Sequence, residues 1–194
     1  MDAESARLYR PRWNVAPTTT SVVLKLARDG RRLVPARFGL DVPGGRLVVN
    51  ARSETAARLR TFRDAFRSAR CVVPSDGYYE WSGRRGARRP YWFHPPGGGL
   101  LLLAGLLFDL PAPAFVILTT AANDVVRPVH HRMPAVLSTG DATAWLGHLD
   151  AALLRAAPAG ALAAREVSPL VNDAANDGPE LLESPAPLRQ LPLV

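Results

Sequence analysis

The stretch Leu100-Leu101-Leu102-Leu103-Ala104-Gly105-Leu106-Leu107-Phe108, followed shortly by Phe115-Val116-Ile117-Leu118-Thr119, decides the fold that this sequence predicts. Both runs are almost wholly apolar, which is typical of strands buried on both faces. The first run falls well short of the ~18 residues that a membrane-spanning helix needs. We therefore expect two strands at the centre of a β-sheet.

Strand-like runs separated by turn residues surround this centre. The runs 21–26 and 32–38 flank Asp29-Gly30, a turn signal that predicts a hairpin. Other strands are expected at 47–49, 71–73, 78–81, 91–94 and 166–167. The predicted core is therefore rich in β-structure.

Between residues 54 and 70 the spacing of apolar residues changes to three or four. Leu59, Phe62 and Phe66 fall on one face of a helix, and three arginines fall on another. We expect one amphipathic helix here, with a basic side that is more often solvated than bound to a partner. Two further helical segments are expected at 142–146 and 151–157.

The chain has 194 residues, enough for one domain with a substantial core. It shows no internal repeat and no linker that would divide it. We therefore expect a single α+β domain over residues 1–183. The proline-rich residues 184–194 are expected to form a loosely ordered tail.

Cysteine usage and the N-terminal residues predict the cellular compartment. Cys71 is the only cysteine, which excludes an internal disulfide and a cysteine-based zinc cluster. The first residues include Asp2, Glu4 and Arg7, so they lack the apolar core of a secretory signal. We expect a cytoplasmic monomer that needs neither a metal nor another cofactor and does not enter a membrane.

The formal net charge is +7, and Lys25 is the only lysine, so arginine carries almost all of the positive charge. Guanidinium binds phosphate well because it can donate two parallel hydrogen bonds. A polyanionic partner such as a nucleic acid is one explanation. The other is genome composition, which can enrich arginine together with Ala, Gly and Pro without any selection for binding.

Glu80 and His130 are the candidate proton-transfer groups. Glu80 lies between Tyr79 and Trp81 in a predicted strand, where burial would raise its pKa towards the range useful for acid–base catalysis. Its other interpretation is a strand carboxylate paired with an arginine. Of His130 and His131, only one is expected to face a site, and a surface role is the alternative for both.

Asn50 and Arg52 are two residues apart at a strand end, so we expect both side chains on one face. An amide and a guanidinium there suit an oxyanion or a phosphate. The alternative is a turn-forming asparagine before a helix that Ser53 caps. Cys71 stands in a strand, where a thiol is most often a small buried apolar group.

Several blocks of the chain, taken together, resemble the SRAP family, the SOS-response-associated peptidases, which are abasic-site-processing proteins. Each block is only moderately specific, but their order along most of the chain makes the resemblance strong. The blocks are Arg12-Trp13-Asn14-Val15-Ala16-Pro17, Asn50-Ala51-Arg52-Ser53-Glu54-Thr55, Cys71-Val72-Val73-Pro74-Ser75-Asp76-Gly77-Tyr78-Tyr79-Glu80-Trp81, His130-His131-Arg132-Met133-Pro134, Val171-Asn172 and Asn176-Asp177-Gly178-Pro179-Glu180-Leu181.

The resemblance implies a curved, partly closed β-sheet with flanking helices. It also implies that an N-terminal cysteine, exposed by self-processing, captures abasic sites in single-stranded DNA. Its α-amine would form a Schiff base with the sugar aldehyde, and its thiol would close a thiazolidine ring.

The same resemblance assigns roles to individual residues. Asn50 would position the amine and the sugar, Glu80 would shuttle protons and His130 would assist opening of the sugar ring. Arg52, Thr119 and Asn14 would contact the DNA.

The sequence departs from the family pattern at its start, where Asp2 stands in place of the Met-Cys-Gly-Arg segment. Two explanations stay open: the start lies inside a longer reading frame that encodes the cysteine, or the chain is an inactive form. Phe38-Gly39-Leu40 also replaces the usual Trp-Gly-Leu, and the following loop lacks a second tryptophan. Weaker stacking of DNA bases is the expected consequence.

The leading hypothesis is a sensor of abasic sites in the DNA damage response, with self-processing peptidase activity and possible lyase activity in its active form. The main alternative is a pseudoenzyme that binds single-stranded DNA without a covalent bond. A third is a cysteine peptidase that uses Cys71 and His130.

Overall fold

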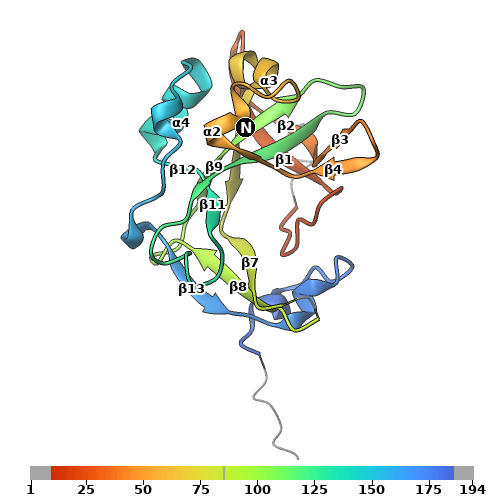
Figure 1. The fold of residues 1–194 in the computed structure, drawn as a ribbon, viewed down its shortest axis with the longest axis vertical. Coiled ribbons are helices and arrows are strands. Elements are labelled where there is room, and N and C mark those ends of the chain that lie inside the picture. Colours follow the sequence, from red (N-terminus) through yellow and green to blue (C-terminus); the bar gives the residue numbers. More distant parts are fainter. Residues whose placement is uncertain (1–9, 85, 186–194) are drawn as a thin grey trace, which may run out of the picture.

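The computed structural model describes residues 10–84 and 86–185 (Figure 1). Its largest element is an eight-stranded sheet in the order β11-β10-β2-β1-β6-β9-β12, with β5 paired to β10. The strands are β1 (Thr20–Ala27), β2 (Gly30–Phe38), β5 (Asn50–Arg52), β6 (Arg70–Ser75), β9 (Leu101–Phe108), β10 (Ala114–Ala121), β11 (Arg132–Pro134) and β12 (Val136–Leu137).

The sheet curves until β9 also pairs with β10, which closes β10, β2, β1, β6 and β9 into a ring. This confirms the α+β fold with a curved, partly closed sheet. The two apolar runs form β9 and β10 at its centre, as predicted, and most of their side chains are buried. Gly105 permits the close packing there, because a Cβ atom would meet Cys71 Sγ at 2.9 Å and the Val116 carbonyl oxygen at 3.0 Å.

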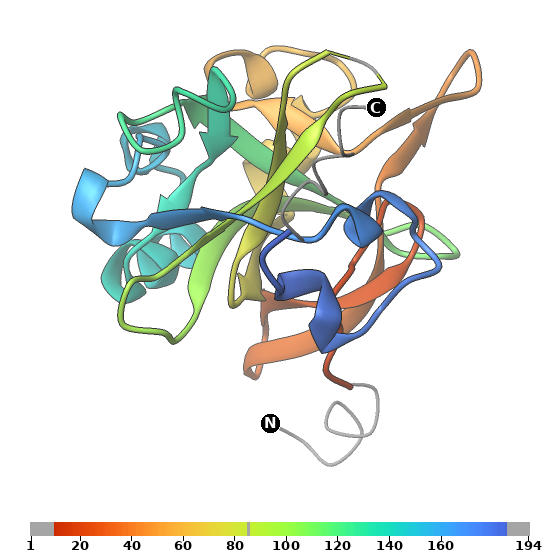
Figure 2. The ribbon, with the colours of Figure 1, turned by 90° about the horizontal axis from the view of Figure 1, so that it is seen from below.

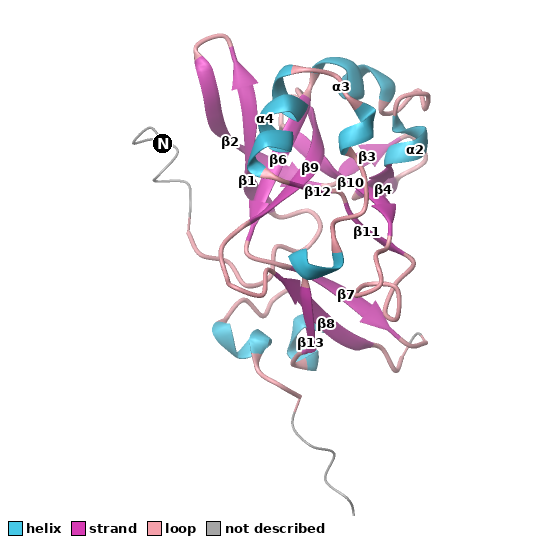
Figure 3. Cartoon of the chain, turned by 90° about the vertical axis from the view of Figure 1, so that its left-hand side faces the viewer, coloured by secondary structure: helices cyan, strands magenta, loops and turns pink. Residues whose placement is uncertain are grey.

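The hairpin of β1 and β2 turns at Asp29-Gly30 as predicted, and Gly30 adopts the positive φ of 123° that a side chain would strain. A two-stranded arm of β3 (Leu40–Val42) and β4 (Arg46–Val48) follows. A separate three-stranded sheet is formed by β7 (Tyr78–Ser82), β8 (Arg89–His94) and β13 (Ala163–Glu166). Figures 1 and 3 place this small sheet at the opposite end of the molecule from the helices.

The prediction of one continuous helix over residues 54–70 is wrong. The chain forms two short helices, α2 (Ser53–Ala56) and α3 (Arg63–Ser68), joined by a turn. Ala56 and Phe62 are both buried, yet residues six apart lie about 120° from each other around a continuous helix. The turn brings both into the core and leaves Leu59, which was predicted to share the apolar face with Phe62, 47% exposed.

Helix α4 (Thr139–Gly147) covers the predicted segment 142–146. Its Ser138 cap accepts a hydrogen bond from Asp141 N, and its buried Trp145 donates from Nε1 to the Cys71 carbonyl. The prediction of a helix at 151–157 is also wrong, because only Ala151–Leu153 is helical there, as a single 3₁₀ turn. The remaining helical turns are all short and of the 3₁₀ type: Ala151–Leu153, Ala159–Ala161, Pro169–Asn172 and Pro179–Leu182.

The C-terminal segment returns to lie beside the N-terminal one, as Figure 2 shows for the dark blue and red ribbons. Val167, Val171 and Leu181 form a small buried cluster there, against which Trp13 and Trp81 pack. Most of the tail predicted at residues 184–194 lies outside the described residues. In the described parts of the chain, no helix is both long and apolar enough to cross a membrane.

Candidate functional site

A cavity of about 480 Å³ lies where the two sheets meet the N- and C-terminal segments. Its wall includes Phe115 and Ile117 of β10, Glu80 of β7 and Asn50 of β5. Residues 12–17 and residues 171–172 form another part of the wall. The cavity therefore gathers residues from distant parts of the sequence, including the carboxyl groups of Asp76 and Glu80.

Glu80 and His130 meet beside this cavity, with His130 Nδ1 3.6 Å from Glu80 Oε1. Burial raises the pKa of Glu80, as expected from the sequence, while His130, the Trp81 N–H and Arg88 act in the opposite direction. Among the described residues, Glu80 forms its ion pair with the histidine, whereas the alternative interpretation had it pair with an arginine. The pair can hold and pass a proton.

The backbone around His130 fixes its ring. His130 N donates to the Val126 carbonyl, which ends the turn before the histidine. Its Nδ1 lies 3.0 Å from the Arg132 carbonyl oxygen and 3.3 Å from the Arg132 N–H. The His131 ring packs against it at 4.5 Å between centroids. Of the two histidines, His130 is the one that faces Glu80.

Asn50 and Arg52 project from the same face of β5, while Ala51 between them is buried, as predicted. The parallel register with β10 places Arg52 opposite Thr119. Asn50 borders both the cavity and a second hollow of about 690 Å³, which we call the arginine groove. This groove is lined by Val42, Arg46, Val48, Asn50, Ala51, Arg52, Thr55, Leu59, Arg60, Thr61 and Phe62.

Arg132 and Glu54 form an ion pair that the sequence did not predict. Two guanidinium nitrogens of Arg132 donate to the two carboxylate oxygens of Glu54, at 2.6 and 2.8 Å. The hydrogen bonds from Arg132 hold the pKa of Glu54 below its usual value. Arg132 also donates to the carbonyl and hydroxyl oxygens of Thr119, which is buried. The pair thus ties α2 to β10 and β11 beside Arg52.

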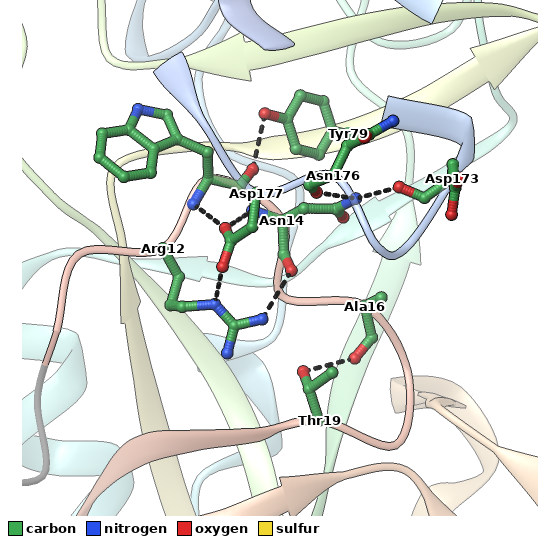
Figure 4. A network of polar contacts seen from close by, with 9 residues as sticks. Arg12, Asn14, Ala16, Thr19, Tyr79, Asp173, Asn176 and Asp177 are labelled. Carbon is green, nitrogen blue, oxygen red and sulfur yellow. Dashed lines mark hydrogen bonds and ion pairs between the residues drawn. The ribbon is translucent and has the colours of Figure 1, made fainter. Parts of the chain in front are cut away.

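Asn14, which the resemblance assigns to DNA contact, lines the cavity and makes hydrogen bonds within the protein. Its side chain is buried, and its amide nitrogen donates to the carbonyls of Asp173 and Asn176 (Figure 4). The same nitrogen also donates to the Val171 carbonyl. An amide that satisfies internal carbonyls has little donor capacity left for a phosphate. Asn14 therefore connects the two terminal segments that wall the cavity.

Asp177 is the centre of that connection. Its carboxylate accepts hydrogen bonds from Trp13 N at 2.7 Å, from Asn14 N at 2.9 Å and from the Arg12 guanidinium (Figure 4). Burial alone would raise the pKa of Asp177, but these donors outweigh it and lower the pKa. Tyr79 adds a hydrogen bond from its hydroxyl to the Trp13 carbonyl.

Cys71 is fully buried on β6, and burial raises the pKa of its thiol. A thiol that cannot ionise or reach solvent cannot act as a nucleophile. This finding excludes the cysteine peptidase that would use Cys71 and His130.

We expect Cys71 in the folded protein to resist a thiol reagent such as DTNB at pH 8 over a time in which the urea-unfolded protein reacts fully. The unfolded sample is the control for reagent quality. Rapid reaction of the folded chain would contradict the buried position.

Comparison with known proteins places this geometry in a family. The family model described as SOS response associated peptidase (SRAP) matches residues 1–174. "Abasic site processing protein YoqW" of Bacillus subtilis is 32% identical over 197 residues, covering 91% of this chain and 87% of that protein. "Abasic site processing protein HMCES" of Gallus gallus is 30% identical, covering 90% of this chain and 66% of that protein.

A solved structure supports the fold separately. A crystal structure of a protein from Bacteroides thetaiotaomicron matches with a TM-score of 0.70 at 21% identity, covering 93% of this chain and 94% of that one. The likeness in fold agrees with the similarity in sequence. Because the family model matches residues 1–174, nearly the whole length, the chain belongs to the SRAP family.

Proposed function

We propose that this protein processes abasic sites in single-stranded DNA as part of the response to DNA damage. The observation that carries the proposal is the Glu80–His130 pair, 3.6 Å apart beside a cavity that Asn50 also lines. The printed names of the relatives describe abasic site processing for those proteins. A DNA substrate also fits the cytoplasmic location predicted from the sequence.

The chemistry begins at the sugar of the abasic site. Opening the ring breaks the bond between C1′ and the ring oxygen. His130 is the proposed donor of a proton to that oxygen, and the C1′ hydroxyl releases its proton to water, which leaves an aldehyde. An amine then attacks the aldehyde carbon and water leaves, which forms a Schiff base. Glu80 is the proposed group that removes a proton from the amine and returns one to the departing hydroxyl.

We propose that the amine is an N-terminal α-amine and that Asn50 positions it and the sugar by hydrogen bonds. Residues 1–9 lie outside the described residues, so the support for this step is the family resemblance. An amine alone gives a reversible Schiff base. A neighbouring cysteine thiol would convert it into a stable thiazolidine, which is the covalent crosslink that the resemblance implies.

The arginine groove is the proposed path of the DNA backbone. It places Arg46, Arg52 and Arg60 along one hollow, and Asn50 lies where the groove meets the cavity. Phosphates in the groove would therefore set the register of the sugar at Asn50. Because one chain forms both hollows, we propose that the protein acts as a monomer.

A second candidate function is binding of single-stranded DNA without chemistry. The arginine groove favours it, because its basic lining could bind a phosphate backbone without help from Glu80 or His130. A protein with this function would bind single-stranded DNA with an affinity that depends on salt, and it would show no preference for abasic DNA.

Denaturing electrophoresis separates the two functions. The full chain is incubated with single-stranded DNA that carries one abasic site, with and without borohydride, and intact DNA is the control. A band trapped only by borohydride identifies a Schiff base, and a heat-stable band without borohydride identifies the thiazolidine crosslink. Equal binding of both DNAs with no trapped band would refute abasic-site processing and leave the second candidate.

We expect Arg52→Gln to weaken binding of single-stranded DNA to a similar extent for all base sequences. Loss of one phosphate contact should reduce the slope of log affinity against log salt by about 0.7. Fluorescence anisotropy over a salt series measures both quantities. The matched control is Arg67→Gln, an exposed arginine of α3 outside the groove, and an equal effect of the two variants would contradict the proposed path.

A further inference from the structure

The strand that carries Glu80 also carries a second polar group on the same face. Side chains alternate along β7, so Tyr78 and Glu80 share one face while Tyr79 and Trp81 occupy the other. The antiparallel register with β8 agrees, since Tyr78 lies opposite Phe93 and Glu80 opposite Tyr91. The Tyr78 ring stacks on Phe93 at 5.2 Å between centroids, which fixes its direction.

The hydroxyl of Tyr78 is buried and has no hydrogen-bond partner among the described residues. Buried polar groups in folded proteins almost always find partners, so one without a partner calls for an explanation. Tyr78 also lines the 480 Å³ cavity together with Glu80. Burial is the main cause of the raised pKa of Tyr78, and the negative charge of Glu80 raises it further. The two groups therefore interact electrostatically.

Several other groups act on Glu80 or lie opposite it. His130 approaches from the segment before β11, Arg88 from the turn before β8, and the Trp81 N–H from β7 itself. Tyr91, opposite Glu80 on β8, directs its hydroxyl to Glu166 of β13 at 3.3 Å. Among the described residues, the face of β7 that carries Glu80 has two buried hydroxyls without a partner, those of Tyr78 and Ser82, and of these only Tyr78 lines the cavity with Glu80.

We propose that Tyr78 is a positioning residue for Glu80, whose hydroxyl donates a hydrogen bond to the Glu80 carboxylate once that carboxyl has released its proton. The inference deepens the proposed function and rests on it, because it concerns the carboxyl assigned there to proton transfer. A carboxyl that both takes and returns a proton in a buried site needs its charged form stabilised. A neutral donor provides this without adding a fixed charge that would hold Glu80 ionised permanently.

Tyr78→Phe removes only the hydroxyl, and the matched control is Tyr79→Phe, which removes the neighbouring hydroxyl from the opposite face. The carboxyl ¹³C signal of Glu80 is followed by NMR as pH is varied, in the full chain without DNA. We expect its titration midpoint to move to higher pH in Tyr78→Phe, because the charged form loses its donor. The midpoint should stay unchanged in Tyr79→Phe.

Thermal stability gives a second readout that a merely structural tyrosine would not show. Where Glu80 is protonated, Tyr78→Phe should be at least as stable as the parent, because it loses an unpaired buried group. Above the midpoint it should be less stable, because the parent gains the new hydrogen bond there. An equal loss of Tm at every pH would overturn the proposal.

The rate of Schiff-base formation distinguishes a failure of this inference from a failure of the proposed function. At the titration midpoint measured for Glu80 in the parent, the Schiff-base rate of Tyr78→Phe should fall about fivefold, with recovery at pH values well above the midpoints of both proteins. A shifted Glu80 midpoint without any reaction on abasic DNA would support Tyr78 and refute the proposed function. An unchanged midpoint in Tyr78→Phe, or a shift found only in Ser82→Ala on the same face, would refute the role of Tyr78.

Discussion

Glu80→Gln is expected to slow formation of the borohydride-trapped adduct with abasic DNA by about 10²- to 10⁴-fold, the usual contribution of a general acid–base group. Glutamine keeps the shape of the side chain but cannot exchange a proton with the amine or the departing hydroxyl. Affinity for intact single-stranded DNA should stay the same, because the arginine groove does not include Glu80. Single-turnover gel assays measure the rate, and fluorescence anisotropy measures the affinity.

The matched control is Glu166→Gln, which removes a carboxylate from the same small sheet, at an ion pair with the exposed Arg89. That variant should react at close to the parent rate. If Glu80→Gln also reacts at the parent rate, the site has another proton-transfer group and the mechanism proposed for Glu80 is wrong.

Asp177→Asn is expected to lower the free energy of unfolding by about 2 kcal/mol, because hydrogen bonds to a charged acceptor contribute more than neutral ones. The carboxylate serves two backbone N–H groups and the Arg12 guanidinium at once. An amide in its place offers one acceptor oxygen and no charge. Urea unfolding followed by tryptophan fluorescence measures the difference.

The control is Asp124→Asn, which breaks a mostly exposed ion pair with Arg127 and should cost less than about 1 kcal/mol. The pH dependence gives a further check. Hydrogen bonding lowers the pKa of Asp177 in the folded state, so its contribution is present above the unfolded pKa and is lost as pH falls through the folded one. The parent and Asp177→Asn should therefore converge in stability in acid, and a constant difference would contradict this account.

Local patterns in the sequence were sufficient to predict most strands and part of the site. The apolar runs of β9 and β10, the hairpin turn at Asp29-Gly30 and the shared face of Asn50 and Arg52 each depend on residues close together in the chain. The aromatic neighbours Tyr79 and Trp81 also led to the expectation of a partly buried Glu80, and Glu80 is half-buried in β7. These features are encoded by periodicity, which a single sequence displays directly.

The features that the sequence did not predict depend on contacts between distant segments. Glu54 and Arg132 are 78 residues apart, and no spacing within either block indicates their ion pair. The break between α2 and α3 follows from where Phe62 must lie in the core, which helical periodicity could not reveal. The burial of Asn14 against the C-terminal segment likewise depends on a partner more than 150 residues away.

The hydrogen bond between Asn14 and Asp177 spans 163 residues and has a consequence for biosynthesis. A ribosome delivers the segment that carries Asn14 well before the one that carries Asp177, so Asn14 gains its carboxylate partner only once residue 177 has emerged. Closure of so long a loop is entropically unfavourable and slow compared with the pairing of neighbouring strands. The nascent chain therefore forms the ring of β10, β2, β1, β6 and β9 before the segment around Asp177 completes the wall of the cavity. An mRNA truncated before the codon for Asp177 yields a product that lacks this part of the wall.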